Sequence, residues 1–327
     1  MLAYIGKRIL QFIPVFIGVT IILFLLRVVI PGDPIKLLAG EKALSETIYQ
    51  QLVTSHHLDE PIIVQYGYYM NDLLHGDLGN SYLRKTPVLD IFAEKFPYTA
   101  RLALCAICVE IVIGIAAGIV SAVRRYTFID GLVTVSTSVL ISMPVFWLGM
   151  LLQMFFGVFL KDVTGGAFSL PISGAGGIIS RYPTWMHYIL PSVTLASVSL
   201  AYTARIMRSQ LLEVMNADYI RTARAKGLSR RAVIMKHALK NAMIPVITFI
   251  GIDFGVMMSG AILTETIFNW PGIGYEIFRA IGQRDWPIVM GGVILVVVVV
   301  MLINLIVDIS YAFFDPRIRY GKKRGDD

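Results

Sequence analysis

The sequence predicts an all-α, polytopic membrane protein with six transmembrane helices. Of its 327 residues, 56% are hydrophobic and only 16% are charged. Several apolar runs reach about 20 residues, the length that crosses a hydrocarbon core of roughly 30 Å. Because backbone groups in lipid must satisfy their own hydrogen bonds, we expect these runs to be helices. The predicted spans are Ile9–Ile30, Leu102–Val123, Leu132–Leu160, Tyr188–Met207, Ala242–Phe268 and Ile288–Ser310.

The distribution of Lys and Arg predicts the orientation. Six spans place both termini on one side, where the predicted loops hold 18 of the 29 basic residues. The other side holds ten, spread over longer loops, and Arg27 lies within the first span. The positive-inside rule therefore places both termini in the cytoplasm. This rule also accounts for the net charge of +7, so the charge does not indicate nucleic-acid binding.

The chain divides into four predicted parts. Residues 1–30 form the first span, residues 31–97 a loop outside the cytoplasm, residues 98–310 a five-helix core, and residues 311–327 a basic cytoplasmic tail. Within the long loop, the stretch Pro61–Gly76 predicts an amphipathic helix on the membrane surface or against the bundle. Its apolar positions recur at helical spacing: Ile62, Tyr66, Tyr69 and Leu73.

Common catalytic motifs do not occur in the sequence. It lacks G-x-x-x-x-G-K-[ST], H-E-x-x-H and G-x-S-x-G, so we expect no enzymatic activity and no cofactor bound by this chain. The adjacent His56 and His57 would point in different directions on a helix, which favours a solvated loop over a metal site. Cys105 and Cys108 lie in an apolar run, which favours packing over redox chemistry.

Two carboxylates lie well inside predicted spans, Glu110 and Asp253. A carboxylate at bilayer depth costs about 2.5–3.5 kcal/mol on insertion scales, so it usually faces protein or water. Asp253 points away from a face of small residues, Gly251, Gly255 and Ser259, that can pack on another helix. We favour a hydrogen bond to a neighbouring helix, and a water-filled translocation path is the alternative.

The segment "DYIRTARAKGLSRRAVIMKHALKNAMIP", residues 218–245, predicts a helix, a glycine turn and a second helix on the cytoplasmic surface. Gly227 suits the end of the first helix, and Ser229 suits the N-cap of the second. Arg221 and Arg224 lie on one face. The opposite face carries Tyr219, Ile220, Ala223 and Gly227. This face could receive the backbone of another protein, or the helix could lie in the interface and bind anionic lipid.

This segment resembles the cytoplasmic "EAA" loop of ATP-binding-cassette importer permeases. That pattern is Glu-Ala-Ala, three residues and Gly, followed later by Pro. Here Arg221-Thr222-Ala223 precedes Gly227, and Pro245 closes the region, without the Glu and the first Ala. Four further stretches are similar to the peptide and nickel branch of this family: "IPGDP", "HGDLGNS", "GAILTETIFNWPGIG" and "DPRIRY". The chain thus resembles the first, B-type, permease subunit of a dipeptide or oligopeptide importer.

The resemblance implies a type I permease fold in the bacterial inner membrane, with an ATPase-coupling region at residues 208–241. It implies these coupling residues: Asp218, Tyr219, Arg221, Ala223, Arg224 and Gly227. The implied partners are a second homologous permease, two ATPases that hold ATP and Mg, an extracytoplasmic binding protein and membrane lipid. The substrate stays open among dipeptides, oligopeptides, nickel chelates and glutathione.

Three other classes fit the sequence less well. A proton-driven transporter could use Glu110 and Asp253, but it would be expected to show inverted repeats or paired broken helices, and the sequence shows neither. An intramembrane hydrolase would need a nucleophile and a base that we do not find. A scaffold without transport activity is the third and weakest alternative.

Overall fold

The computed structural model describes residues 2–29, 45–55, 57–177, 180–258 and 262–314. The described residues are helical apart from turns, loops and one isolated bridge between Asn80 and Pro87. Six helical stretches among them are long and apolar enough to cross a membrane, which confirms the predicted fold class. Ile30, His56, Ser259 and residues 315–327 of the predicted tail lie outside the described residues.

Three of the membrane-length stretches extend beyond the predicted spans. The first helix, α1, is Leu2–Val29, and the last, α16, is Trp286–Phe314. The second stretch is continuous from Val88 to Val123. It consists of α5 (Val88–Val109), the π-helical segment η1 (Glu110–Gly114) and α6 (Ile115–Val123). Its first turns carry Asp90, Glu94 and Lys95, so an apolar run detects only the later part of the helix.

The third predicted span, Leu132–Leu160, is wrong as a single helix. Helix α7 (Phe128–Ser142) ends at Met143, which is extended, with φ −91° and ψ 127°. Pro144 follows, and the residue before a proline is disfavoured in the helical region. The membrane-length helix is instead Val145–Thr164. It comprises α8 (Val145–Leu152), the π-helical segment η2 (Gln153–Phe159) and α9 (Leu160–Thr164).

The fourth and fifth spans also differ in their ends. The fourth comprises the short 3-10 helix η3 (Thr184–Tyr188) and α10 (Ile189–Val214). The fifth begins at Arg230 rather than at Ala242. It joins α12 (Arg230–Ala232), the π-helical η4 (Val233–Ala238) and α13 (Leu239–Met258). Basic residues in its first three turns conceal this helix from an apolar-run search.

The remaining helices connect these spans. They are α3 (Glu46–Ser55), α4 (Ile62–Leu74), α11 (Asp218–Ala225), α14 (Ile262–Ile267) and α15 (Ile273–Gln283). Helix α4 confirms the helix predicted in the long loop, and it lies against the bundle. Its Tyr66 and Tyr69 rings stand 5.5 and 5.7 Å from the Phe24 ring of α1.

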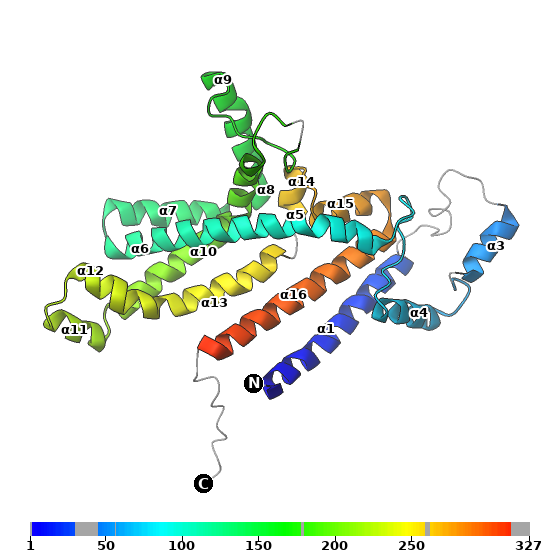
Figure 1. Ribbon diagram of the computed structural model, residues 1–327, viewed down its shortest axis with the longest axis horizontal. Helices are drawn as coiled ribbons and strands as arrows, with labels where there is room; N and C mark the ends of the chain where they lie inside the picture. The colour runs from blue at the N-terminus through cyan, green and yellow to red at the C-terminus, as the bar shows by residue number, and fades with distance from the viewer. Residues whose placement is uncertain (1, 30–44, 56, 178–179, 259–261, 315–327) are drawn as a thin grey trace, which may run out of the picture.

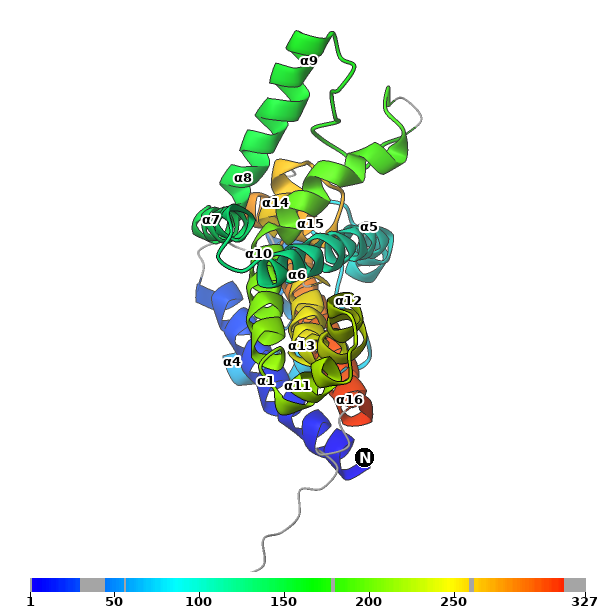
Figure 2. The same ribbon diagram turned by 90° about the vertical axis from the view of Figure 1, so that its left-hand side faces the viewer.

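Helix α10 lies at the centre of the bundle, in contact with α5, α6, α7, α8 and α13 (Figures 1 and 2). Small residues allow these helices to approach closely, as is usual between membrane helices. At Gly118 of α6, a Cβ atom would lie 2.6 Å from the Ala204 carbonyl oxygen and 2.6 Å from Met207 Cβ of α10. The α8–η2–α9 stretch instead projects away from the bundle in both views.

Candidate functional site

The candidate site lies at one end of the bundle, where α10 is followed by α11 and α12 (Figure 1). We call this the basic end. Helix α11 is attached there by its apolar side chains, because Ile220 is fully buried and Ala223 is 6% exposed. Both belong to the same buried cluster as Leu211 of α10 and Val233 of η4. The short α11 is therefore fixed to the bundle by its own core.

This packing corrects the predicted α11 face at Ile220 and Ala223, whereas Tyr219 and Gly227 of that face are exposed. The face of Ile220 and Ala223 does not stand open to another protein, because it covers the chain's own core. The exposed face is charged instead. The side chains of Asp218 and Arg221 are 95% and 74% exposed, and they form an ion pair at 3.4 Å. Arg224 is also exposed at this end. The apolar side chains of α11 are buried against its own chain, so its charged side is the surface that a partner can contact.

Gly227 and Ser229 occupy the predicted positions in the turn after α11. Gly227 has a φ of +78°, and its N–H donates to the Arg224 carbonyl oxygen at 2.9 Å. A Cβ atom at Gly227 would meet nothing within 4 Å. The glycine is thus required by the left-handed backbone and not by a close contact within the chain. Ser229 Oγ accepts from the Ala232 N–H at 3.3 Å, which confirms the N-cap.

Tyr219 ties α11 to the fifth span. Its Oη accepts a hydrogen bond from Asn241 Nδ2 at 2.8 Å, and 44% of the residue is exposed. Asn241 lies in α13. A movement of α11 would therefore be transmitted to a membrane-length helix as well as to α10, from which the chain enters α11.

A hollow of about 310 Å³ opens beside α11 at the basic end. Its lining brings together Arg125, Arg224 and Arg230, with an apolar floor that includes Leu211 and Ile234. Two of these arginines are anchored, since Arg230 donates to the Val123 carbonyl oxygen at 3.0 Å and Arg224 to that of Met215 at 3.4 Å. Sequence analysis missed this group because Arg125 is about 100 residues from the other two.

A buried carboxylate fixes α10 just before it leads into α11. Asp130 of α7 accepts from Arg208 Nε at 2.8 Å and Nη2 at 2.9 Å. It also accepts from the Ser121 hydroxyl of α6 and from the Tyr126 N–H. Arg208, and then these two further donors, hold the pKa of the Asp130 carboxyl far below its usual range. We call these four residues the arginine brace: Ser121, Tyr126, Asp130 and Arg208. No motif in the sequence indicated it.

A second buried carboxylate lies toward the opposite end of the bundle, within "GAILTETIFNWPGIG". Glu265 is fully buried and accepts from Thr99 Oγ1 at 2.7 Å and from the Tyr275 N–H at 2.9 Å. A Cβ atom at Gly272 would lie 2.3 Å from Glu265 Oε1. At Gly274 it would lie 3.0 Å from Oε2. We call these five residues the glycine clasp; it explains why the stretch contains two glycines after its glutamate.

The structure brings the two predicted intramembrane carboxylates together. Glu110 of η1 is fully buried, and Thr203 Oγ1 of α10 donates to its Oε1 at 2.6 Å. Its side chain lies near the Asp253 side chain of α13. Glu110 Oε2 and Asp253 Oδ2 are buried and have no hydrogen-bond partner among the described residues. Gly255 packs on α16, where its Cβ would lie 3.4 Å from Ile303.

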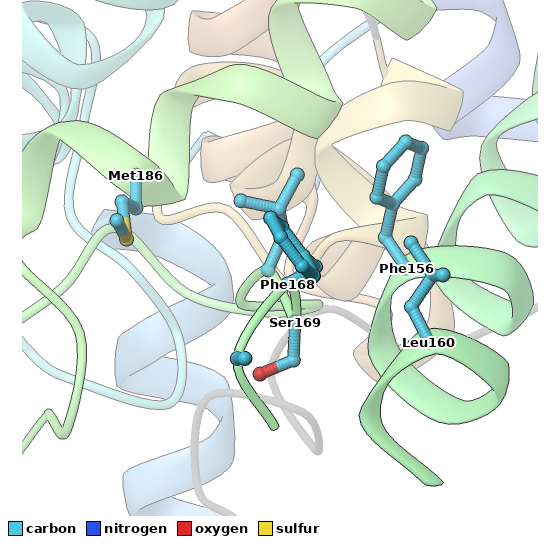
Figure 3. A pocket seen from close by; sticks show the side chains of 7 residues that line it. Phe156, Leu160, Phe168, Ser169 and Met186 are labelled. Atoms are coloured by element: carbon cyan, nitrogen blue, oxygen red, sulfur yellow. The ribbon is translucent and has the colours of Figure 1, made fainter. Parts of the chain in front are cut away.

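The projecting helix carries an apolar surface. Phe155, Phe159 and Phe168 are 47%, 55% and 71% exposed. Beside them lies a hollow of about 460 Å³ between the helix and the loop that returns from it. Figure 3 shows Phe156 and Leu160 on the helix and Phe168 on the loop around this hollow. Its lining is almost entirely apolar, so it offers no catalytic group.

The fold and these sites define the membrane component of a transport system. A family model described as "Binding-protein-dependent transport system inner membrane component" matches residues 114–320, and a model of the N-terminal part of such components matches residues 1–103. The chain belongs to this family. It is a multi-pass permease component of the inner membrane and not the ATPase of its system.

Curated relatives cover the chain almost completely. It is 41% identical to the dipeptide transport system permease protein DppB of Escherichia coli K12, over 98% of this chain and 100% of that protein. The corresponding DppB protein of Alkalihalophilus pseudofirmus is 42% identical with the same coverage. The glutathione transport system permease protein GsiC of Escherichia coli O6:H1 is 40% identical, again over 98% and 100%.

A solved structure shares the fold. A chain of the MetNI methionine ABC transporter, in an inward-facing conformation, aligns with a TM-score of 0.54 and 16% sequence identity. The alignment covers 69% of this chain and 97% of that one. It supports the ABC importer permease fold and carries no information on substrate.

Proposed function

We propose that this chain is a permease subunit of an ATP-driven importer and that it forms, with a second homologous permease, the path for dipeptides or oligopeptides. An extracytoplasmic binding protein delivers the substrate, and two ATPase subunits hold ATP and Mg. The names of relatives at 41–42% identity over the whole chain support a dipeptide substrate. A glutathione transport system permease protein is 40% identical to this chain, so glutathione, a γ-linked tripeptide, is the alternative substrate.

The observation that carries the coupling role is the construction of α11. Its buried face, Ile220 and Ala223, fixes the helix to the bundle, while Asp218 and Arg221 remain on an exposed face. The arginine brace holds α10 near the start of this segment. A partner that pushes on α11 thus moves α10, and through Tyr219 also α13. In this proposal α11 and both termini lie in the cytoplasm.

The projecting α8–α9 helix is the surface that we assign to the second permease. It is long and apolar enough to cross a membrane, and almost none of it is buried within the chain. An apolar helix with exposed small and aromatic residues can pack against helices of a homologous subunit. The path for the substrate would then lie between the two permeases.

A proton-coupled transporter is the second candidate, because Glu110 and Asp253 form a pair in the bundle interior. Such paired intramembrane acids occur in proton relays. The two candidates differ in their energy source. Uptake into proteoliposomes that stops without ATP, and that continues without a proton gradient, supports the importer.

The coupling role is tested in the assembled complex in nanodiscs, with the ATPases, the binding protein and a dipeptide. Arg221→Glu reverses a charge on the exposed face of α11. Arg279→Glu is the control, because it makes the same change at an exposed residue of α15, at the other end of the bundle. Because the Asp218–Arg221 pair is exposed, the substitution should cost at most about 1 kcal/mol of stability. We expect Arg221→Glu to weaken ATPase association at least about tenfold and to abolish dipeptide-stimulated ATP hydrolysis.

Gly227→Arg is a less specific variant, because the structure shows no neighbour for the new side chain and a positive φ that it would strain. If Arg221→Glu leaves ATPase association and stimulated hydrolysis as in Arg279→Glu, the docking role of α11 is wrong. The basic end would then be a surface for anionic lipid, which vesicle binding of the same two variants would reveal.

A further inference from the structure

A hollow of about 560 Å³ opens at the end of the bundle opposite α11. Its walls come from the end of α1, from α4, from the loop of residues 77–85 and from the start of α16. Unlike the hollow of the projecting helix, it is lined by polar and charged side chains as well as by apolar ones. Neither the coupling site nor the predicted translocation residues take part in it.

Arg27 gives this hollow a cationic wall. It lies two residues before the end of α1, at the end of a membrane-length stretch, where a long basic side chain can reach the head-group level. Within the described part of the chain, Arg27 makes no hydrogen bond and no ion pair. A guanidinium that lines a cavity and has no partner among the described residues is available to an oxyanion.

Tyr69 supplies a second donor on the same side. Its hydroxyl oxygen is buried and has no hydrogen-bond partner among the described residues. Burial, and then the neighbouring Tyr66, raise the pKa of the Tyr69 phenol strongly, and the charge of Arg27, which lines the same hollow, opposes this rise. Burial likewise raises the pKa of Tyr82, with Arg27 again opposing it. The phenols remain protonated and can donate hydrogen bonds.

Asp72 gives the hollow an anionic wall. It stands three residues after Tyr69 on α4, so both side chains project from neighbouring positions of that helix. Asp72 and Arg27 line the same hollow but form no ion pair with one another. A second acid of the lining, Asp77, is already engaged, because its Oδ1 accepts from the Gly79 N–H at 2.7 Å. Opposite charges on separate walls complement a ligand that carries both charges.

The hollow lies where two membrane-length helices end, at the end of α1 and the start of α16. Its lining contains Trp286, the first residue of α16, and Arg27, near the last residue of α1. Aromatic side chains at the ends of membrane spans lie at the head-group level. A lipid head group that enters the hollow can therefore bring its phosphate to the Arg27 side chain.

We propose that this hollow binds a zwitterionic group whose oxyanion contacts Arg27 and Tyr69 and whose primary ammonium contacts Asp72. Two molecules offer this chemistry: the head group of phosphatidylethanolamine and a free dipeptide with its ammonium and carboxylate ends. The site is separate from α11, so it stands whether or not the proposed coupling role is correct.

The lipid arm of the test uses the complete transporter in nanodiscs of phosphatidylethanolamine, phosphatidylcholine or phosphatidylglycerol, with retained lipid counted by native mass spectrometry. Phosphatidylcholine lacks ammonium hydrogens and phosphatidylglycerol lacks the cation, so we expect phosphatidylethanolamine to be retained preferentially. Arg27→Leu and Asp72→Asn should each lower this retention at least about tenfold. Tyr69→Phe removes only a hydroxyl, and it keeps the test valid if Arg27→Leu fails to insert.

The controls carry the same changes at exposed positions outside the hollow, Arg279→Leu and Asp59→Asn. The peptide arm measures equilibrium binding of radiolabelled dialanine to the same variants, without the binding protein. Loss of lipid retention in the three hollow variants identifies phosphatidylethanolamine as the ligand, and loss of dialanine binding identifies the peptide. If the hollow variants equal the controls in both arms, the proposal is overturned, and Arg27 serves only to anchor α1.

Discussion

The long helix from Val88 to Val123 is held at two levels, at Thr99 and at Ser121, by buried carboxylates of opposite character. Near its C-terminal end, the arginine brace surrounds Asp130 with a guanidinium, a hydroxyl and a backbone N–H. Near its N-terminal end, the glycine clasp surrounds Glu265 with the Thr99 hydroxyl and backbone N–H groups at the start of α15. The brace contains a full positive charge, and the clasp relies on neutral donors.

This difference sets opposite proton affinities. In the brace, Arg208 and the other donors hold the pKa of Asp130 low. In the clasp, burial raises the pKa of Glu265, and the hydrogen bonds from Thr99 and the α15 backbone oppose it only in part. The brace thus uses a salt bridge near the attachment of α11. The clasp uses neutral hydroxyl and backbone N–H donors at the turn between α14 and α15. Two buried carboxyl groups thus perform different structural tasks because their donors differ.

The largest effect should follow from Arg208→Leu, which leaves the Asp130 carboxylate buried and without its ion-pair partner. Removing one partner of a buried pair costs about 3–5 kcal/mol. Arg205→Leu is the control, since Arg205 is exposed and donates to the neutral Thr137 and Ser138 hydroxyls. Thermal unfolding of the purified protein in detergent measures both. Equal losses in the two variants would show that the brace has no special weight.

A smaller loss should follow from Gly272→Ala in the clasp. The new Cβ would lie 2.3 Å from Glu265 Oε1 and 2.5 Å from Thr99 Oγ1, so the carboxylate must move away from its donors. Overpacking of this kind costs about 1–3 kcal/mol. Gly131→Ala, at a helical position where a Cβ meets nothing within 4 Å, should be neutral or stabilising by up to about 1 kcal/mol. Thermal unfolding decides, and a Gly272→Ala protein as stable as wild type would contradict the clasp.

The two carboxylates should also respond to pH in opposite directions. The folded-state pKa of Asp130 is depressed, so its stabilisation is present above about pH 4 and is lost as the pH falls through the folded value. The folded-state pKa of Glu265 is raised, so its contribution is largest below about pH 4 and declines as the pH rises through the folded value. Melting temperatures measured across the acid range should therefore fall less steeply in Asp130→Asn than in wild type. In Glu265→Gln, the decrease in melting temperature that wild type shows as the pH rises above about 4 should be smaller.

Apolar runs in the sequence predicted the existence of six membrane helices but not all of their ends. Length and hydropathy detect the apolar part of a helix that must lie in lipid. The helix that begins at Arg230 has polar first turns, and a search for apolar runs does not detect them. Pro144 could have divided the third predicted span, because the residue before a proline leaves the helical region.

The candidate site was predictable where chemistry is local along the chain. The glycine turn at Gly227 and the Ser229 cap follow from backbone geometry, and both occur as expected. Contacts between distant segments gave no such signal. Asp130 and Arg208 are 78 residues apart, and Thr99 and Glu265 are 166 apart. The wrong assignment of Ile220 and Ala223 to an open face of α11 has the same origin. A helical wheel shows which residues share a face, but it does not show which face the chain itself will cover.

The smallest effect, a stabilising one, should come from the two carboxyl groups in the bundle interior, Glu110 and Asp253. Glu110 Oε2 and Asp253 Oδ2 are buried without hydrogen-bond partners among the described residues. Asp253→Asn removes one of two mutually repelling groups and places an amide N–H donor next to Glu110. A hydrogen bond gained in this way contributes about 1 kcal/mol, so the melting temperature should rise slightly. Asp253→Leu supplies no donor and should lower it.

This pair then distinguishes structural from functional carboxylates. If Asp253→Asn stabilises the protein and keeps ATP-driven uptake, Asp253 serves helix packing, as the brace and the clasp do. A rise in stability with a loss of uptake would mark the pair as a site that retains unfavourable contacts for transport. Equal destabilisation by Asn and Leu would show that the protein needs the carboxylate itself, and the pair would then no longer be the strained counterpart of the two satisfied carboxylates at the ends.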